Sequence, residues 1–338
     1  MAVSVPNRVD PRALLALLAD GGVRSGPRLA GELGASRGDT TRLIGELRES
    51  GVDIRAVGGR GYRLPAPVEL LDADGIRGAL RGEMRAAIHR LDVLFEVDST
   101  NTRLLELGAP PPGCANVCSS ELQRGGRGRR GRPWISPFGG SLALSLGWSF
   151  ADVTAAAPTL SLAVGVAVSR ALRRLGAKDA RLKWPNDIWL RERKIGGVLV
   201  ELRTEPAGPA HAVIGVGLNV SLSADQRRAI EAGGIRIATV ADACPGLVSR
   251  NGLAAALLEE LLSMLAEFER SGFRAFREEW LMLDALAGRA ARVFSAGGPV
   301  EGTARGVDLD GALLLEVDGR LQRHVSAEVS LRLNEGDS

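Results

Sequence analysis

The chain has 338 residues, of which 45% are hydrophobic and 25% charged, which is typical of a folded globular protein with two or three domains. A formal net charge of +3 is too small for the whole surface to act as a polyanion binder. The chain has three cysteines, which lack metal-ligand spacing, and three histidines, so a zinc site is not expected. The cysteines fit ordinary thiols in a reducing compartment.

Residues 11–65 show three short helical patterns followed by a hairpin. The second pattern starts at Ser25-Gly-Pro27 and the third at Ser36, each with a hydroxyl residue ahead of the helix. Residues 52–57, a Gly58-Gly59 turn and residues 61–64 then predict two paired strands. This order of elements describes a winged helix-turn-helix, which we assign to residues 1–66.

The charge of this segment favours contact with DNA, because attraction to phosphates provides most of the affinity. Residues 1–65 contain ten arginines and seven acids. The predicted DNA-binding residues lie on the third helix and the hairpin: Ser36, Arg37, Thr40, Thr41, Arg42 and Arg60. Asp39 and Glu46 oppose phosphate contact, so a small helical packing module remains the alternative.

Pro65-Ala-Pro67 marks a boundary, after which 68–90 is predicted as a helical connector and 91–285 alternates strands with helices. We assign an α/β catalytic-type domain to residues 67–287. Its strands are expected near 91–97, 116–120, 141–148, 180–183, 188–190, 197–203 and 212–216, and its helices near 100–107, 159–175 and 253–270.

The uncharged stretch 153–169 is short for a membrane span, and we interpret it as part of a buried helix. No signal peptide is visible, so the sequence predicts a cytoplasmic protein. From Gly288 onward the pattern changes to short strands, with Asp310-Gly311 and Asp318-Gly319 as turns and apolar alternation in 313–317 and 325–333. This pattern predicts a small β-barrel-like domain over residues 288–338.

One loop is rich in both glycine and arginine: Gln123-Arg-Gly-Gly-Arg-Gly-Arg-Arg-Gly-Arg132, with no acid between Glu121 and Asp152. Glycine makes it a poor helix and a poor strand, and its five guanidinium groups repel one another when no anion is present. The loop leads directly into the apolar strand pattern of 141–148. We therefore predict that it becomes ordered around a phosphate or carboxylate, with a flexible basic linker or an RNA-binding tract as the alternative.

Other polar clusters stand where predicted strands end. Asp98-Ser-Thr-Asn101 offers more hydrogen-bonding side chains than one helix cap needs. Lys183-Trp-Pro-Asn-Asp187 supplies a cation, an amide and a carboxylate suited to a phosphate or Mg²⁺, although Pro-Asn-Asp is also an ordinary turn. Lys194-Ile-Gly-Gly197 and Gly215-Val-Gly-Leu-Asn219 are weak signals alone; the glycines of the second can let a flat ring approach the backbone.

Together these motifs resemble biotin protein ligases in order and spacing, over nearly the whole chain. The N-terminal segment resembles the winged helix-turn-helix of the bifunctional form, which also represses biotin-synthesis genes. The resemblance implies an α/β (α+β) core like that of class II synthetase-like biotin/lipoate ligases, followed by an SH3-like domain. The motifs that carry it are Asp98–Asn101, Gln123–Arg132, Trp134 with Ser136-Pro137, Lys183–Asp187, Lys194–Glu201 and Gly215–Asn219.

The resemblance implies a two-step reaction. Biotin's carboxylate is activated with ATP and Mg²⁺ to biotinyl-5′-AMP, and the biotinyl group then passes to a lysine of the biotin carboxyl carrier domain of acetyl-CoA carboxylase. Biotin is then both the substrate and the precursor of a co-repressor, and a ligand-induced homodimer binds biotin operon DNA. Alternatives are a lipoate-type ligase, a biotin sensor without catalysis, and a ligase whose DNA-binding module is not functional.

Residue roles follow from the same resemblance. The implied catalytic residues are Lys194 and Arg129. The implied biotin-binding residues are Ser99, Thr100, Asn101, Gln123, Arg127, Gly128, Arg129, Lys194, Gly215 and Gly217. The implied ATP-binding residues are Arg129, Arg130, Arg132, Trp134, Lys183, Asn186, Asp187 and Asn219, and Asp187 is also the expected Mg²⁺ ligand.

Overall fold

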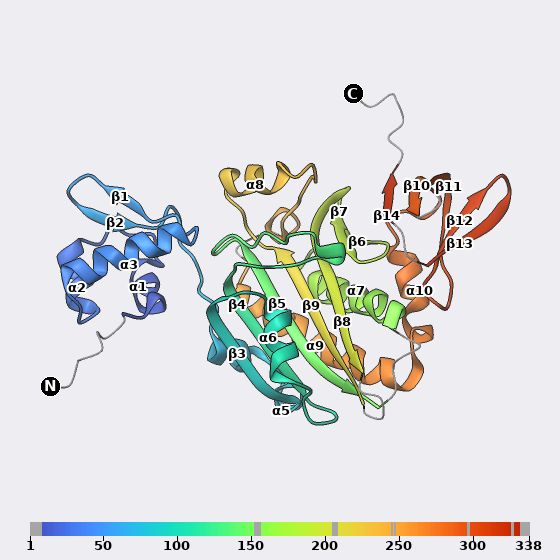
Figure 1. Cartoon of the computed structure of the whole chain (residues 1–338), viewed down its shortest axis with the longest axis horizontal. Helices are drawn as coiled ribbons and strands as arrows, with labels where there is room; N and C mark the ends of the chain where they lie inside the picture. The colour runs from blue at the N-terminus through green and yellow to red at the C-terminus, as the bar shows by residue number, and fades with distance from the viewer. Residues whose placement is uncertain are drawn as a thin grey trace.

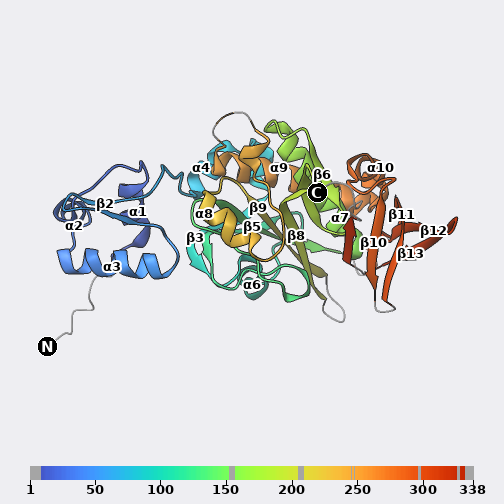
Figure 2. The ribbon, with the colours of Figure 1, turned by 90° about the horizontal axis from the view of Figure 1, so that it is seen from above.

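The computed structural model describes residues 9–151, 157–204, 209–244, 246, 248–295, 298–325 and 328–331. Three units lie in a row, with the N-terminal helices at one end, a large sheet in the middle and a smaller sheet at the other end (Figures 1 and 2). This arrangement confirms the predicted α/β class. Among the described residues, no helix is long and apolar enough to cross a membrane.

The N-terminal unit consists of three helices and a hairpin. They are α1 (Pro11–Leu18), α2 (Gly26–Glu32), α3 (Arg37–Glu49), β1 (Arg55–Val57) and β2 (Gly61–Arg63). The predicted caps are present, because the hydroxyls of Ser25 and Ser36 accept backbone N–H groups from the first turns of α2 and α3. Leucines from all three helices form the core of the unit. The element order is the one predicted for a winged helix-turn-helix.

The central unit is a seven-stranded sheet covered by helices on both faces (Figure 1). Only β3 and β4 are parallel, and the other neighbouring pairs are antiparallel. The strand order is β3 (Ile88–Val97), β4 (Ala115–Gln123), β5 (Ser141–Phe150), β9 (Ala210–Asn219), β8 (Arg193–Thr204), β7 (Asp187–Leu190) and β6 (Ala180–Lys183).

Two long helices, α7 (Ala157–Arg174) and α9 (Arg250–Ser271), pack on one face of this sheet, and α6 (Thr100–Leu107) packs on the other. The predicted helical connector is present as α4 (Ala73–Ala79) and α5 (Gly82–Ala86). The remaining helices are α8 (Ala224–Glu231) and α10 (Arg274–Leu283). The start of the predicted 153–169 helix, residues 153–156, lies outside the described residues.

Side-chain size differs between the two faces of the middle strands. β5 is buried along its whole length, and its residues alternate between small ones and Leu, Trp or Phe. The large side chains pack toward α7 and α9, as Phe150 does against Phe268 at 6.2 Å between ring centroids. The small residues face α6. β9 repeats the pattern with Gly215 and Gly217, so the α6 side of the sheet has unfilled volume.

The C-terminal unit is a five-stranded antiparallel sheet in the order β13-β12-β11-β10-β14. Its strands are β10 (Ala290–Ser295), β11 (Gly298–Val307), β12 (Leu313–Val317), β13 (Arg320–His324) and β14 (Glu328–Leu331). Asp318 and Gly319 form the predicted turn, both with positive φ. The Trp184 indole N–H donates to the Gly311 carbonyl at 3.0 Å, which ties this unit to the central one.

A buried ion pair holds the segment that joins the N-terminal and central units. Glu121 of β4 and Arg250 of α9 lie 2.9 Å apart, and both are almost fully buried. The Leu71 N–H donates to Glu121 at 2.5 Å, while Arg250 also donates to the carbonyls of Glu69 and Ser141. These hydrogen bonds give both charged groups partners, which a buried pair requires to persist away from water, and Arg250 Nη2 has its contact with the Glu121 carboxylate.

Candidate active site

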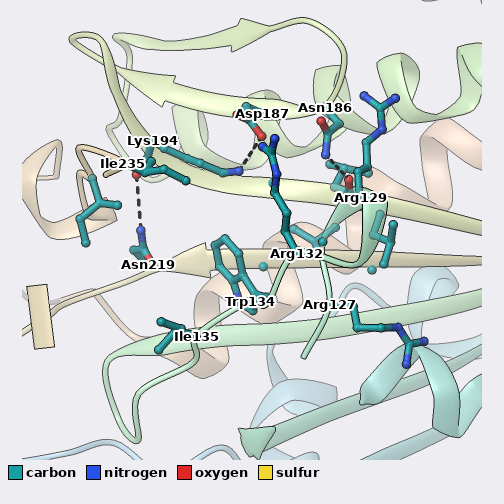
Figure 3. A pocket seen from close by; sticks show the side chains of 18 of the residues that line it. Arg127, Arg129, Arg132, Trp134, Ile135, Asn186, Asp187, Lys194, Asn219 and Ile235 are labelled. Atoms are coloured by element: carbon teal, nitrogen blue, oxygen red, sulfur yellow. Dashed lines mark hydrogen bonds and ion pairs between the residues drawn. The ribbon is translucent and has the colours of Figure 1, made fainter. Parts of the chain in front are cut away.

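A cavity of about 950 Å³ lies above the small-residue face of the sheet. The Gly/Arg loop (residues 123–134) and the segment 230–237, which comprises the end of α8 and the residues after it, border it (Figure 3). Every residue predicted for biotin or ATP lines this one cavity: Ser99, Thr100, Asn101, Gln123, Arg127, Gly128, Arg129, Arg130, Arg132, Trp134, Lys183, Asn186, Asp187, Lys194, Gly215, Gly217 and Asn219. Residues that are up to 120 positions apart in the sequence therefore line the same cavity.

The floor of the cavity contains a chain of hydrogen bonds between side chains of α6 and the sheet. The backbone N–H and the hydroxyl of Thr100 both donate to Gln123 Oε1, at 2.9 and 3.1 Å. Ser145 Oγ lies 2.7 Å from Thr100 Oγ1 and 2.6 Å from Asn101 Oδ1. Asn101 Nδ2 in turn donates to Glu201 at 2.7 Å.

These contacts fix the direction of two amide groups. Gln123 Oε1 already accepts two donors, so its Nε2 is left to donate, and it donates to Ser136 Oγ at 3.5 Å. Asn101 turns its oxygen toward Ser145 and its nitrogen toward Glu201. Most of this network is used to position α6 and Gln123, which explains why the segment has more polar groups than a helix cap needs.

Two glycines of β9 are required by close neighbours. A Cβ on Gly215 would lie 2.4 Å from Asn101 Oδ1, and one on Gly217 would lie 2.5 Å from the Trp134 ring. The predicted approach of a flat ring to these glycines is thus observed at Gly217, where the ring is the protein's own Trp134. The indole lies along the wall of the cavity in Figure 3.

Lys194 is fixed at both its backbone and its side chain. Its N–H donates to the Arg236 carbonyl at 3.0 Å, and its carbonyl accepts from the Ala238 N–H at 2.9 Å. The Lys194 ammonium lies 2.7 Å from Asp187 and 5.9 Å from the centre of the Trp134 ring. The ammonium group therefore projects into the cavity with a carboxylate as its partner (Figure 3).

The Lys183–Asp187 segment contains the turn that joins β6 to β7, with Lys183 paired to Asp187, and this turn is buried or half-buried. Trp184 is buried and precedes a cis proline. Asn186 Nδ2 donates to the Val198 carbonyl at 2.7 Å, and the Asn186 backbone carbonyl accepts from the Val198 N–H at 2.9 Å, which leaves the side-chain oxygen Oδ1 to face a ligand. The Lys183 ammonium lies 4.4 Å from the centre of the Trp189 ring, within reach of a cation–π interaction.

Two backbone hydrogen bonds within the Gly/Arg loop hold its two sides together. The Gly128 N–H donates to the Arg132 carbonyl at 2.7 Å, and the Trp134 N–H donates to the Gly126 carbonyl at 2.8 Å. Arg129 and Arg132 point toward the strand segment that carries Asn186 and Asp187, whereas Arg127 points away from it (Figure 3). The loop thus aims cations at one part of the cavity.

Several residues of the site were not predicted from the sequence: Ser145 and Glu201, which contact the lining residue Asn101, and Ile235, which lines the cavity itself. Ser145 could have been found as a hydroxyl that interrupts the leucines of β5, and Glu201 as an acid within the apolar β8 pattern. Ile235, which is 45% exposed, lies at the mouth of the cavity next to Gly233 and Gly234. No motif marked this segment, because two glycines followed by an isoleucine do not indicate a binding residue in the sequence.

The site does not contain the groups of a cysteine or histidine enzyme. Burial raises the pKa of the Cys118 thiol to about 12, and burial, aided by the charge of Arg203, lowers the pKa of His211. Within the described ranges, no group of three or more His, Cys, Asp or Glu side chains could hold a metal ion. The chemistry available is that of ammonium and guanidinium groups facing an anion.

The predicted DNA-binding residues are exposed, with one exception. Ser36, Arg37, Thr41, Arg42 and Arg60 lie on the surface of the N-terminal unit. The prediction for Thr40 is wrong: Thr40 is only 1% exposed, because α3 turns this side of the helix toward the unit's core. Arg42 is paired with Asp39 at 3.3 Å and Glu46 at 2.8 Å, so DNA has to compete with these acids.

Comparison with known proteins identifies the class. The model of the biotin/lipoate A/B protein ligase family matches residues 94–219, and that of the biotin protein ligase C-terminal domain matches 288–332. A biotin protein ligase from Aquifex aeolicus, solved in complex with biotin and ATP, has a TM-score of 0.60 at 26% identity, over 73% of this chain and 100% of its own. The enzyme is therefore a ligase of this structural class.

Two curated relatives narrow the assignment. The bifunctional ligase/repressor BirA of Escherichia coli K12 is 41% identical over 323 residues, 95% of this chain and 97% of that protein. The biotin–[acetyl-CoA-carboxylase] ligase of Mycobacterium tuberculosis is 33% identical over 74% of this chain and 91% of its own. The chain belongs to the biotin protein ligases, and its similarity to the bifunctional ligase/repressors extends over nearly its whole length.

Replacing Gly215 by alanine tests the geometry of the floor. The new Cβ would force Asn101 out of its position, and we expect the KM for biotin to rise about ten- to hundredfold while the protein stays folded. Gly78→Ala is the matched control, because a Cβ there meets no atom within 4 Å. Steady-state kinetics with varied biotin measures both. Equal KM values for the two variants would contradict the floor described above.

Proposed function

We propose that the chain activates biotin with ATP and transfers the biotinyl group to a lysine of the biotin carboxyl carrier domain of acetyl-CoA carboxylase. A biotin carboxylate oxygen bonds to the α-phosphorus, and the bond from that phosphorus to the β-bridging oxygen breaks, so that pyrophosphate leaves. The neutral carrier lysine then attacks the acyl carbon and loses a proton, and AMP leaves. The single observation that carries this proposal is the Lys194 ammonium projecting into a cavity bordered by the Gly/Arg loop.

The electrostatic problem of the first step matches these groups. A carboxylate and a triphosphate repel each other, and negative charge grows as the new bond forms, so that cations must be in place beforehand. We propose that Lys194 contacts the biotin carboxylate and the phosphate, and that Arg129 closes over the adenylate. Arg132, Asn186 and Asp187 then face the nucleotide. Closure of the loop also keeps water from the mixed anhydride.

The biotin ring is proposed to lie at the α6 end of the cavity. Gln123 Nε2 carries two N–H groups, of which one is used on Ser136 Oγ at 3.5 Å, and a ureido carbonyl is an acceptor that the other can bind. The remaining predicted biotin contacts surround it: Ser99, Thr100, Asn101, Arg127, Gly128, Gly215 and Gly217. Arg130, Trp134, Lys183 and Asn219 complete the proposed nucleotide side.

Mg²⁺ is proposed to accompany ATP and to neutralise part of the triphosphate charge. Asp187 and the free oxygen of Asn186 offer the oxygen ligands that Mg²⁺ prefers. Asp187 is paired with Lys194 in this structure. Two protein oxygens are few, and Mg²⁺ sites of this kind are completed by substrate phosphates and water. We therefore propose that the ion enters together with ATP.

We also propose that the protein is cytoplasmic, and that a ligand-induced dimer of it binds biotin operon DNA and represses transcription of the operon. The exposed residues of α3 and the hairpin support DNA contact, and similarity to bifunctional relatives extends to this unit. One sheet edge supports the dimer: β8 pairs with β7 only as far as Gly197, and within the described chain its later residues pair only with β9. The proposed domains are 1–66, 67–287 and 288–338.

Lys194→Ala tests the catalytic assignment. Without the ammonium, the two substrate anions are not neutralised, and we expect biotin-dependent exchange of pyrophosphate into ATP to fall by about a hundredfold or more. Lys178→Ala is the control, since Lys178 is an exposed lysine outside the cavity. An unchanged exchange rate in Lys194→Ala would remove this residue from the active site.

Arg60→Ala tests the DNA-binding surface. Loss of one phosphate contact should weaken binding to the biotin operon promoter. It should also make the slope of log binding constant against log salt concentration shallower by about one. Arg270→Ala, an exposed arginine on α9, should bind like the wild type. Gel-shift titrations with biotin and ATP at several salt concentrations give both values. If Arg60→Ala kept the wild-type affinity and salt dependence, the hairpin would have no role in DNA binding.

A further inference from the structure

Two of the chain's lysines lie near indole rings in the cavity. Of the 43 lysine and arginine residues, only Lys178, Lys183 and Lys194 are lysines. The Lys183 ammonium lies 4.4 Å from the centre of the Trp189 ring. The Lys194 ammonium lies 5.9 Å from the centre of the Trp134 ring. The shorter of these contacts, between Lys183 and Trp189, joins two neighbouring strands of the sheet, and both residues line the cavity.

The pairing of β6 with β7 places Trp189 beside Lys183. Lys183 of β6 pairs with Asp187 of β7, and Trp189 follows Asp187 two positions later. Side chains two positions apart on a strand point to the same face, so Lys183 and Trp189 are diagonal neighbours on one face of the sheet. Long and aromatic side chains reach each other over this separation. The contact therefore follows from the register of the strands.

The Trp189 indole offers its ring face and not its N–H group. A buried indole N–H ordinarily donates a hydrogen bond, as that of Trp184 does to the Gly311 carbonyl. Trp189 Nε1 is also buried, but among the residues that the structure describes it has no acceptor. The face of an indole carries negative potential and attracts an ammonium within about 6 Å of the ring centre. The ring face therefore explains a tryptophan here, and a phenyl ring should keep most of the contact.

A fixed ring restricts where the lysine can place its charge. The four-carbon stem of a lysine is flexible, whereas a cation that stabilises a reacting anion acts best when its position is set beforehand. Trp189 lies on β7 between Ile188 and Leu190, whose side chains are buried in the core on the other face of the strand. The strand thus fixes the ring, and the ring restricts the ammonium.

We infer that Trp189 is a positioning residue for Lys183, and that its ring face holds the Lys183 ammonium at the nucleotide side of the cavity. The contact is a property of β6 and β7, whereas the nucleotide as ligand rests on the proposed function. Trp189→Leu removes the ring but keeps an apolar side chain, and Trp189→Phe keeps a ring. These two variants therefore separate the ring face from apolar packing.

Nuclear magnetic resonance tests the contact without any substrate. Protein grown with carbon-13-labelled lysine gives ε-methylene signals from three lysines only, and the signal absent from Lys183→Arg belongs to Lys183. We expect this signal upfield of that of Lys178, because the ring current shields protons above an aromatic face. The upfield shift should be lost in Trp189→Leu and largely kept in Trp189→Phe. A Lys183 signal that does not move in Trp189→Leu would overturn the inference, whatever the activity of the enzyme.

The kinetics of pyrophosphate exchange test the consequence for the reaction. Trp189→Leu should raise the KM for ATP about fivefold, as expected for loss of one cation–π contact, and leave the KM for biotin within about twofold. Trp189→Phe should restore most of the KM for ATP. Phe294→Leu, which changes an exposed aromatic residue outside the cavity, should match the wild type.

A double-mutant cycle shows whether Trp189 acts through Lys183 or contacts the nucleotide itself. In the Lys183→Met background, Trp189→Leu should have no further effect on the KM for ATP. Additive effects, or an unchanged KM for ATP in Trp189→Leu alone, would contradict the positioning role. If the wild type showed no biotin-dependent exchange, the proposed function would fail, and the Lys183 signal would still decide whether Trp189 holds this lysine.

Discussion

The site depends on one constraint, which is that strands β5 and β9 carry small side chains on the face that meets α6. Serine, alanine and glycine at alternate positions cannot fill the space above the sheet, while the leucines and aromatic residues between them build the core on the other face. The same alternation therefore supplies both stability and a cavity. Gly215 and Gly217 show how tightly this volume is used, since Asn101 and Trp134 lie against their α-carbons.

Around this cavity, cationic groups have acidic partners from the protein itself. Lys194 is paired with Asp187, and Arg127 with Glu201. Arg42 on the proposed DNA-reading helix likewise lies between two acids. Such pairs lower the repulsion between neighbouring cations, and a carboxylate or phosphate of a ligand can replace the internal acid. On the proposed function, binding is an exchange of anions at these cations.

Much of the site could be predicted from the sequence, because its strongest signals are local. The Gly/Arg loop and Lys183–Asp187 place unusual side chains at the ends of apolar strands, and all of these except Arg124 line the cavity. Contacts between distant segments were harder to predict. Thr40 has the right chemistry for DNA but faces inward, and Glu201 becomes informative only when Asn101 and Arg127 are seen beside it. Hydrophobic periodicity gave the helices and strands but not these pairings.

The central claim is that ligand anions replace the protein's own acids as partners of these cations. A crystal structure with bound biotinyl-5′-AMP tests it most directly. We expect the Lys194 ammonium to lie about 3 Å from a phosphate or acyl oxygen of the ligand, with the Gly/Arg loop closed over it. A structure in which Lys194 still contacts only Asp187, and no lysine or arginine approaches the ligand's charged oxygens, would contradict the account.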